Sequence, residues 1–243
     1  VKYFALMALS ALHDQGSLNQ ILAEISENSE SDIALRHAGI VALAKTQTPQ
    51  VLESLKNHSS EIVRVSAVVA LRRLRHANVA SFLDDSSDRV ASEAGSAIYD
   101  LPILEAMPRL SESVNIENRP IEFQRRALNS SHRVGTAQAA SRIVAFAVSP
   151  SNDVSMRLEG LKLLENWCQS DPRDRVLNDH RPISDRSLDL AINALEPQLQ
   201  RLMVGSSEVR DEAIRVASQL GIKGIAPLLV ERVANIELSS AER

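Results

Sequence analysis

Apolar side chains recur along the chain with the spacing of one face of an α-helix. Counted from Val63 as position zero, small or branched apolar residues stand at +4, +7, +8 and +11, which is one stripe of a 3.6-residue helix. Close matches begin at residues 1, 35, 90, 156 and 209, and position +4 is Ala or Gly in all six copies. A side chain that small lets a neighbouring helix approach closely, so the pattern predicts helices stacked on helices.

The spacing between copies has the length of a helix pair. Successive starts lie 34, 28, 27, 66 and 53 residues apart, and each wide gap holds a weaker copy, at 123–128 and at 191–195. A period of 27 to 34 residues is typical of a solenoid built from helix pairs. The sequence therefore predicts an all-α fold, an α-α superhelix of about seven or eight helix pairs, as a single repeat domain over residues 1–243.

The segments between the copies predict the second helix of each pair. They occupy residues 17–25, 48–58, 101–110 and 223–233, and several carry Pro near their start, where a missing N–H costs nothing. A capping side chain also stands just before most copies of the repeated helix. The expected N-caps are Asp32, Ser60, Ser87, Asn152 and Ser206.

The residue directly after position zero is usually basic. With this feature the repeat resembles the short HEAT repeats of bacterial proteins, and the resemblance covers nearly the whole chain. In that family such side chains bridge consecutive repeats. The resemblance implies the same role for Lys2, Arg36, Arg64, Arg157 and Arg210, whereas Ala91 departs from the pattern. The family consists mostly of scaffolds and binding surfaces, so the resemblance predicts the fold and says little about chemistry.

Residues 167–203 carry a second, narrower resemblance. The stretch "WCQSDPRDRVLNDHRPISDRSLDL" resembles the HEAT segment of large planctomycete-type multidomain proteins, which combine a β-propeller, helical repeats and a c-type cytochrome domain. This resemblance implies that the chain connects such domains in an extracytoplasmic (periplasmic) location; otherwise a cytoplasmic location is expected. The chain opens "VKYFAL" without an initiator Met, which also leads us to expect a piece of a larger protein.

Composition narrows the possible chemistry. Aromatic residues make up only 3% of the chain and the formal net charge is −4, so the core must be aliphatic, and no global charge attracts nucleic acid or an anionic membrane. A single cysteine, Cys168, excludes an internal disulfide, a thiolate zinc site and a CxxCH haem attachment within the chain. No apolar run of the sequence is long enough to span a membrane.

Two basic clusters are candidate binding surfaces. Arg72 and Arg73 end one repeated helix, where cations also interact favourably with the helix dipole, and this structural interpretation is preferred there. Arg125, Arg126 and Arg133 belong to the densest basic stretch, which coincides with a weaker copy of the repeat. Relaxed packing constraints in such a copy favour a binding role for these arginines. Binding of nucleic acid is disfavoured because acidic residues interleave with the stretch and because it offers no spare aromatic side chain on which bases could stack.

The other titratable residues form no catalytic or metal-binding pattern. The six histidines lack metal-ligand spacing, and Cys168 has no neighbouring His, which predicts a buried, inert thiol. Asp171, Asp174 and Asp179 are interleaved with arginines, which indicates mutual neutralisation on a solvated loop and not a calcium site. We therefore expect no catalytic, cofactor-binding or metal-binding residues and no enzymatic activity.

Residues 169–185 are too long for a simple connection between paired helices, which usually takes about 2 to 8 residues. We expect an ordered insertion that turns Val176, Leu177 and Ile183 inward and that two prolines stiffen. The insertion would replace the second helix of the repeat that starts at Met156. Because it interrupts a smooth repeat surface, it is a candidate docking feature for a partner.

The expected function is a non-catalytic module for protein interaction, a spacer or a scaffold. Its expected partner is another protein or an adjacent domain of the same polypeptide, and no cofactor is expected. The main alternative is a nucleic-acid-binding protein that resembles the HEAT-like alkylpurine DNA glycosylases and uses residues 119–142, although nucleic acid is the less favoured partner. A third class, an enzyme similar to the HEAT-like bilin lyases, would need a titratable pocket that the sequence does not locate.

Overall fold

The computed structural model describes residues 1–29, 31–169 and 171–235. Over these residues the chain forms helices and no β-strand, apart from one isolated β-bridge between Arg173 and His180. The prediction of an all-α fold is confirmed.

The chain divides into two compact units, residues 1–113 and 114–243. Each unit has a core rich in aliphatic side chains, in which Leu43 and Leu71 are fully buried in the first unit and Leu164 in the second. The core is not purely aliphatic as expected, because its largest fully buried side chains are aromatic: Phe82, Tyr99, Phe123, Phe146 and Trp167. The expectation of a single repeat domain stays a prediction.

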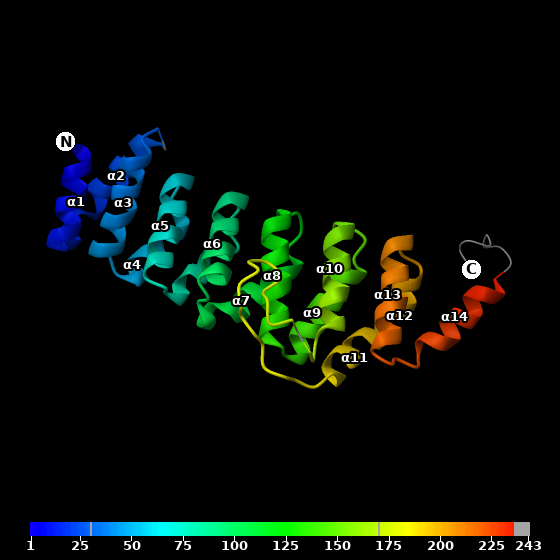
Figure 1. Cartoon of the computed structure of the whole chain (residues 1–243). Helices are drawn as coiled ribbons and strands as arrows, with labels where there is room; N and C mark the ends of the chain where they lie inside the picture. The colour runs from blue at the N-terminus through cyan, green and yellow to red at the C-terminus, as the bar shows by residue number, and fades with distance from the viewer. Residues whose placement is uncertain (30, 170, 236–243) are drawn as a thin grey trace. The chain divides into compact units, whose positions relative to one another are not determined.

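In the first unit, four repeated helices stand side by side and shorter helices form a second layer (Figure 1). The row consists of α1 (Lys2–Leu12), α3 (Ile33–Thr46), α5 (Glu61–Arg73) and α6 (Asp88–Asp100). The second layer consists of α2 (Leu18–Asn28), α4 (Pro49–Ser54), the 3-10 helix η3 (Ala77–Phe82) and α7 (Met107–Glu112). The shorter 3-10 helices are η1 (Gln15–Ser17), η2 (Leu55–Asn57), η4 (Leu104–Ala106) and, at the boundary of the units, η5 (Ser113–Asn115). Each helix of the row packs against the next one, and α2 lies against both α3 and α5.

The second unit has a row of three repeated helices, α8 (Ile121–Val134), α10 (Val154–Glu165) and α13 (Ser207–Gln219). Behind them lie α9 (Ala137–Val148), α11 (Asp189–Leu195), η6 (Glu196–Gln198), α12 (Leu199–Met203) and α14 (Ile225–Ala234). α10 packs directly against α13, whereas α11 packs against α9. The prediction that 191–195 begins another member of the row is therefore wrong: this weaker copy belongs to the second layer.

The small residue at position +4 receives the second helix of the preceding pair. A Cβ atom added to Gly39 of α3 would lie 2.7 Å from Cγ1 of Ile25 in α2. At the same position of α10, a Cβ atom on Gly160 would lie 3.4 Å from Cγ2 of Ile143 in α9. The close approach predicted from the sequence is thus present in both units.

Most expected N-caps stand at the start of a row helix, but one does not. Asp32 and Ser87 accept hydrogen bonds from the backbone N–H groups of Leu35 and Val90, while Ser60 and Ser206 occupy the N-cap positions of α5 and α13 without a side-chain hydrogen bond. The N-cap of α10 is Asp153, which accepts from two backbone N–H groups. The prediction of Asn152 is wrong, because its amide donates instead to the carbonyl oxygen of Phe146.

Within the described ranges, no helix combines the length and the apolar character that crossing a membrane would require.

Candidate functional site

The helix row of the first unit carries two adjoining hollows on its surface. The larger, of about 340 Å³, is lined from α3, α5 and α6 by Ile33, Arg36, His37, Ile40, Val65, Ser66, Val69, Arg89 and Glu93. The smaller, of about 280 Å³, lies toward the C-terminal ends of α3 and α5 and is lined by Val41, Ala44, Lys45, Arg73 and Leu74. We call these two sets of residues together the α3–α5–α6 face.

The floor of this face is apolar because of residues outside the repeated stripe. Offsets 0, +4, +7 and +8 turn toward neighbouring helices, so Ile40 at +5 of α3 and Val65 and Val69 at +2 and +6 of α5 point to the surface side. Ile40 is buried, with 7% of its surface exposed, Val65 and Val69 are half-buried, and Ile33 at the edge is 72% exposed. Water-exposed aliphatic side chains around a hollow are typical of a surface that is covered by a partner.

The rim of the α3–α5–α6 face is positively charged. Four cationic side chains line the two hollows, Arg36, Lys45, Arg73 and Arg89, against one carboxylate, Glu93, and Arg89 also forms an ion pair at 3.6 Å with Glu61 of α5. The Glu93 carboxylate forms an ion pair with Arg72 of α5, with 3.1 Å between its Oε1 and Nη1 of the arginine. The face therefore combines an aliphatic floor with an excess of positive charge, which favours an acidic ligand that also carries apolar groups.

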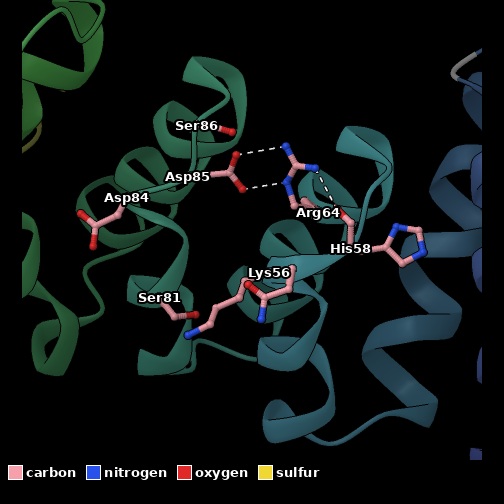
Figure 2. Close-up of a pocket in the computed structure, with 8 residues that line it drawn as sticks. Lys56, His58, Arg64, Ser81, Asp84, Asp85 and Ser86 are labelled. Atoms are coloured by element: carbon pink, nitrogen blue, oxygen red, sulfur yellow. Dashed lines mark hydrogen bonds and ion pairs between the residues drawn. The ribbon is translucent and has the colours of Figure 1, made fainter.

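A third hollow, of about 470 Å³, opens at one end of α5 and has a largely polar lining (Figure 2). Its most buried cation, Arg64, donates to both carboxylate oxygens of Asp85 at 2.7 and 3.1 Å and to the carbonyl oxygen of His58 at 2.9 Å. Asp85 in turn accepts from the backbone N–H of Ser87, the N-cap of α6. The guanidinium is thus engaged in fixing α5 to the turn that begins α6.

The basic residues at +1 of the other copies play different structural roles. Lys2 pairs with Glu24 and Glu27 of α2 at 2.9 and 2.7 Å, which joins the two helices of one pair. The Nε of Arg157, which is buried, donates at 2.8 Å to the carbonyl oxygen of Ala147 at the end of α9.

The two further residues of this set are Arg210 and Arg36. Arg210 pairs at 2.8 Å with its sequence neighbour Asp211. Arg36 contributes to the larger hollow of the α3–α5–α6 face. The contacts of Arg64 and Arg157 match the bridging role that the HEAT resemblance implies.

The basic stretch of α8 does not form one exposed cluster. Arg125 is exposed, and Arg126 donates at 3.2 Å to the carbonyl oxygen of Glu122 one turn earlier. Arg133 points into the structure, where it donates to Asp174 at 3.1 Å and to the carbonyl oxygen of Arg181 at 3.0 Å. The interpretation of Arg133 as part of an open binding surface is corrected, because its charge is used inside the fold.

The long segment between α10 and α11 is organised around a buried carboxylate. Asp174 is 4% exposed, accepts from the backbone N–H groups of Val176 and Leu177 at 2.9 Å each, and pairs with Arg133 and Arg181 at 3.1 and 3.5 Å. The interpretation of its aspartates as solvated is wrong for Asp174, whereas the expected neutralisation by a neighbouring arginine is present in its ion pair with Arg181. Val176, Leu177 and Ile183, expected to turn inward, are only half-buried.

A second cluster holds the same segment to the end of α8. The Arg186 guanidinium lies 3.9 Å from the ring centroid of Trp167, and Arg186 also donates to the carbonyl oxygens of Trp167, at 2.7 Å, and of His132. The His132 ring meets the Trp167 ring edge-on at 5.7 Å between centroids. Cys168, expected to be buried, is half-buried beside this cluster.

Burial in this cluster lowers the pKa values of two groups, His132 and Arg186. Burial lowers the pKa of His132 to about 3, and the nearby Arg186 guanidinium contributes in the same direction. Burial likewise lowers the pKa of Arg186 to about 10. The imidazole is therefore neutral at physiological pH, and its Nε2, 3.2 Å from the carbonyl oxygen of Asn166, donates to that oxygen.

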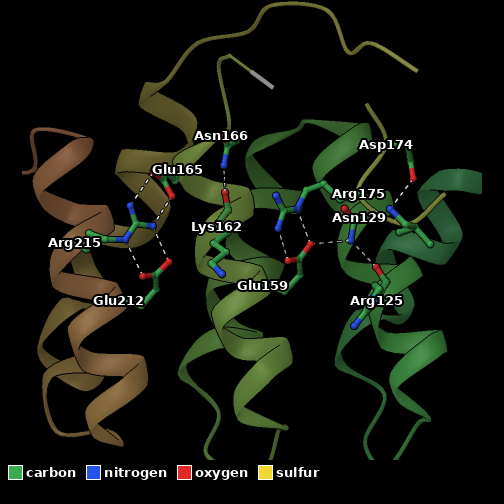
Figure 3. A network of polar contacts seen from close by, with 11 residues as sticks. Arg125, Asn129, Glu159, Lys162, Glu165, Asn166, Asp174, Arg175, Glu212 and Arg215 are labelled. Carbon is green, nitrogen blue, oxygen red and sulfur yellow. Dashed lines mark hydrogen bonds and ion pairs between the residues drawn. The ribbon is translucent and has the colours of Figure 1, made fainter. Parts of the chain in front are cut away.

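Ion pairs also join the row helices of the second unit (Figure 3). Glu159 of α10 accepts two hydrogen bonds from Arg175, at 2.6 and 2.8 Å. Burial alone would raise the pKa of the Glu159 carboxyl, but the hydrogen bonds and the charge of Arg175 lower this pKa below its usual value. Arg215 of α13 binds both Glu165 of α10 and Glu212 of its own helix, and hydrogen bonds to Glu212 and Glu165 raise the pKa of Arg215. These perturbed groups are engaged in holding helices and the long segment together.

No group of three or more His, Cys, Asp or Glu side chains that could hold a metal ion occurs in the part of the chain that the structure describes. No protein-family model matches the chain, and no curated protein matches it either.

Sequence reasoning included Arg73, which lines the smaller hollow, and Arg72, which pairs with Glu93, among the candidates, but it missed the α3–α5–α6 face itself. The available signal was the set of aliphatic residues at offsets +2, +5 and +6, such as Ile40, Val65 and Val69, which the stacking stripe does not require. Arg186 carried no periodic signal, because its partners His132 and Trp167 are 54 and 19 residues away in sequence.

Proposed function

We propose that this chain is a non-catalytic protein-interaction module whose two units are stretches of a HEAT-like solenoid with about seven helix pairs. The α3–α5–α6 face is its docking surface. The partner is a protein that presents an acidic segment with branched aliphatic side chains.

One observation carries this proposal: the α3–α5–α6 face places an aliphatic floor and a basic rim next to each other on a row of packed helices. Ile40, Val65 and Val69 supply the floor, and Lys45 and Arg73 lie at the rim. Burying aliphatic side chains supplies most of the binding free energy, at about 25 cal/mol per Å². The rim charges raise the association rate and select acidic partners.

The arrangement of the other charged groups supports binding over catalysis. Arg64 and Asp85, Arg133 and Asp174, and Arg175 and Glu159 each form ion pairs between structural elements. Groups with these partners serve the framework, whereas a general acid or base needs access to a substrate.

A nucleic-acid function is less well supported than a protein-binding one. Arg125 is the exposed arginine of the three that were candidates in α8, since Arg126 is half-buried and Arg133 is paired with Asp174. Affinity for duplex DNA depends on several phosphate contacts at once, and each contributes to the salt dependence.

Selection of peptides from a random phage-displayed library, with the full chain as target, tests the proposal. We expect enrichment of peptides with aspartate or glutamate next to leucine, isoleucine or valine, with dissociation constants on the order of 1 to 100 µM. Measured by fluorescence polarisation, their affinity should fall at least about tenfold in the double variant Lys45→Glu, Arg73→Glu, because two attractive charges become repulsive.

The control is a double variant with the same charge change in the second unit, Arg201→Glu with Lys223→Glu, at two exposed positions. It should bind the selected peptides like the wild type. Failure to enrich any such peptide, or equal affinity for both double variants, would reject the α3–α5–α6 face. Tight binding of duplex DNA at about 150 mM salt that is lost in the variant Arg125→Glu, Arg126→Glu would establish the nucleic-acid function in its place.

A further inference from the structure

The two hollows of the α3–α5–α6 face follow one another along the same pair of helices. α3 and α5 stand side by side in the row (Figure 1). The larger hollow is lined from residues 33–40 of α3 and 65–69 of α5, and the smaller one from residues 41–45 of α3 and 73–74 of α5. Both sets advance toward the C-terminal ends together, so the hollows are arranged along the helix axes and not across them.

The distance between the hollows is close to two turns of a helix. From the larger hollow to the smaller one, the lining residues are displaced by about seven positions on α3 and again by about seven on α5. At 1.5 Å per residue this displacement corresponds to about 10 Å. Because both helices give the same value, the distance belongs to the face and not to one helix alone.

An α-helix presents two side chains at this distance on one side, whereas an extended segment does not. Residues i and i+7 of a helix lie about 10.5 Å apart along its axis and share a face. In an extended segment, side chains on the same side recur about every 6.8 Å. The second aliphatic side chain of an extended partner would therefore lie about 3 Å short of the second hollow or about 3 Å beyond it.

The charged side chains indicate where the acidic residues of such a helix lie. Both charged residues that line the smaller hollow are cationic and exposed, Lys45 of α3 and Arg73 of α5. In the larger hollow, Arg89 is paired with Glu61. On a helix, residues three and four positions from an apolar residue lie on its two sides, so acidic side chains at those positions meet Lys45 on one side and Arg73 on the other.

We propose that the partner docks on the α3–α5–α6 face as an α-helix that lies along α3 and α5. Two aliphatic side chains seven residues apart enter the two hollows, and acidic side chains three and four positions from the one in the smaller hollow contact Lys45 and Arg73. This inference rests on the proposed function and adds the conformation and the spacing of the segment that binds.

Synthetic peptides with the full chain as receptor test this inference by fluorescence polarisation. Two peptides of identical composition, built from alanine, glutamine and glutamate, carry two leucines at i and i+7 or at i and i+4, with two glutamates three and four residues beyond the second leucine. The i, i+7 peptide should bind at least about tenfold more tightly, because it alone buries both leucines. Proline midway between its leucines should cost at least about tenfold in affinity, because proline breaks the helix.

Filling the smaller hollow tests the assignment of the two leucines to two hollows. Ala44, which is half-buried, lines the smaller hollow. Ala44→Trp should weaken binding of the i, i+7 peptide at least about tenfold. It should leave unchanged the affinity of a peptide with one leucine replaced by alanine, because the remaining leucine still has the larger hollow. Ala145→Trp, at an exposed alanine of α9, is the matched control and should bind both peptides like the wild type, and circular dichroism verifies that both variants are folded.

The conformation of the bound peptide gives the deciding result. In NMR spectra of an isotope-labelled i, i+7 peptide, the Cα chemical shifts should move to helical values when the wild-type chain is added. Extended shifts in the bound peptide, equal affinities of the i, i+7 and i, i+4 peptides, or an equal loss for the one-leucine and two-leucine peptides in Ala44→Trp would overturn this inference. Each of these outcomes leaves the α3–α5–α6 face standing as a surface for acidic aliphatic segments. If neither these peptides nor any from the displayed library bind, the proposed function is rejected, and the helical partner with it.

Discussion

At the scale of single residues, His132 is the group whose chemistry the fold changes most. Its imidazole is 4% exposed and faces Arg186, Arg133 and Arg175, which all disfavour a second proton. The unfolded chain takes up a proton on this imidazole near its ordinary pKa of 6.5, whereas the folded chain does so only near pH 3. Stability is therefore lost as the pH falls through the unfolded value.

We predict that acidification from pH 7 to pH 5 destabilises the chain by about 2 kcal/mol through His132 alone. The variant His132→Gln, which keeps a donor for the Asn166 carbonyl, should remove most of this dependence in urea denaturation at the two pH values. His180→Gln, at an exposed histidine, is the control and should leave it intact. Arg175 and Arg215 lower the pKa values of Glu159 and Glu165, respectively. The stability that these two carboxylates contribute is therefore lost only below about pH 4.5, outside the range of this measurement. An unchanged pH dependence in His132→Gln would contradict the assignment.

Gly135 combines two constraints that a pair of variants can separate. Its φ is +68°, and a Cβ atom there would lie 3.1 Å from Cδ of Arg186 and closer still to the guanidinium. Gly221 has nearly the same φ, +69°, with no atom within 4 Å of an added Cβ. We predict that Gly221→Ala costs about 1 to 2 kcal/mol of backbone strain. Gly135→Ala should cost at least about 1 kcal/mol more, because Arg186 must also leave the Trp167 ring. Equal losses in thermal or urea unfolding would show that Arg186 adapts freely.

Residue-scale features were predictable from sequence where they repeat. The buried small residues at +4, such as Gly39 and Ala67, follow from periodicity, since a helix face is fixed by spacing alone. The environments of Asp174 and His132 were not predictable, because each depends on a contact with a residue far along the chain, Arg133 and Arg186 respectively. Nothing in the local sequence distinguishes a buried carboxylate from a solvated one when the partner is distant.

At the scale of elements, the same periodicity predicts the helices well and their layer poorly. The second helices expected at 17–25 and 223–233 correspond to α2 and α14. The copy at 191–195 has the right offsets, yet the long segment before it carries α11 to the second layer, against α9. A stripe of apolar residues determines which side of a helix is buried, but the connections determine which neighbour it meets.

The segment between α10 and α11 depends on the carboxylate of Asp174. We predict that Asp174→Ala releases it, because Arg133 and Arg181 lose their counter-charge and two backbone N–H groups lose their acceptor. Limited trypsin digestion of the folded protein should then cut at Arg173, Arg175 and Arg181 at least about tenfold faster than in the wild type. Asp179→Ala, at an exposed aspartate of the same segment, should digest like the wild type. Rapid cleavage of the wild type itself at these arginines would show that the buried carboxylate does not order the segment, and would remove the basis for expecting a docking feature there.

At the scale of the whole molecule, the packing is local in sequence. α5 packs against α3, α6 and α2, while α10 packs against α8, α9 and α13. Stability in such a structure is approximately a sum of contributions from each helix pair and from its contacts with neighbouring pairs. Damage to one core should therefore be felt by adjacent helices and should fade with distance along the chain.

We predict that Leu71→Ala and Leu164→Ala, each at a fully buried position, cost about 2 to 5 kcal/mol but loosen different parts of the chain. In hydrogen exchange followed by mass spectrometry, Leu71→Ala should accelerate exchange in α3, α5 and α6 and leave α13 unchanged. Leu164→Ala should accelerate exchange in α8, α10 and α13 and leave α1 and α3 unchanged. If either substitution accelerated exchange evenly over both units, the chain would unfold as one cooperative domain, and the prediction of local stability would be wrong. A local response would instead show that cooperative unfolding extends only as far as the contacts that couple neighbouring helices.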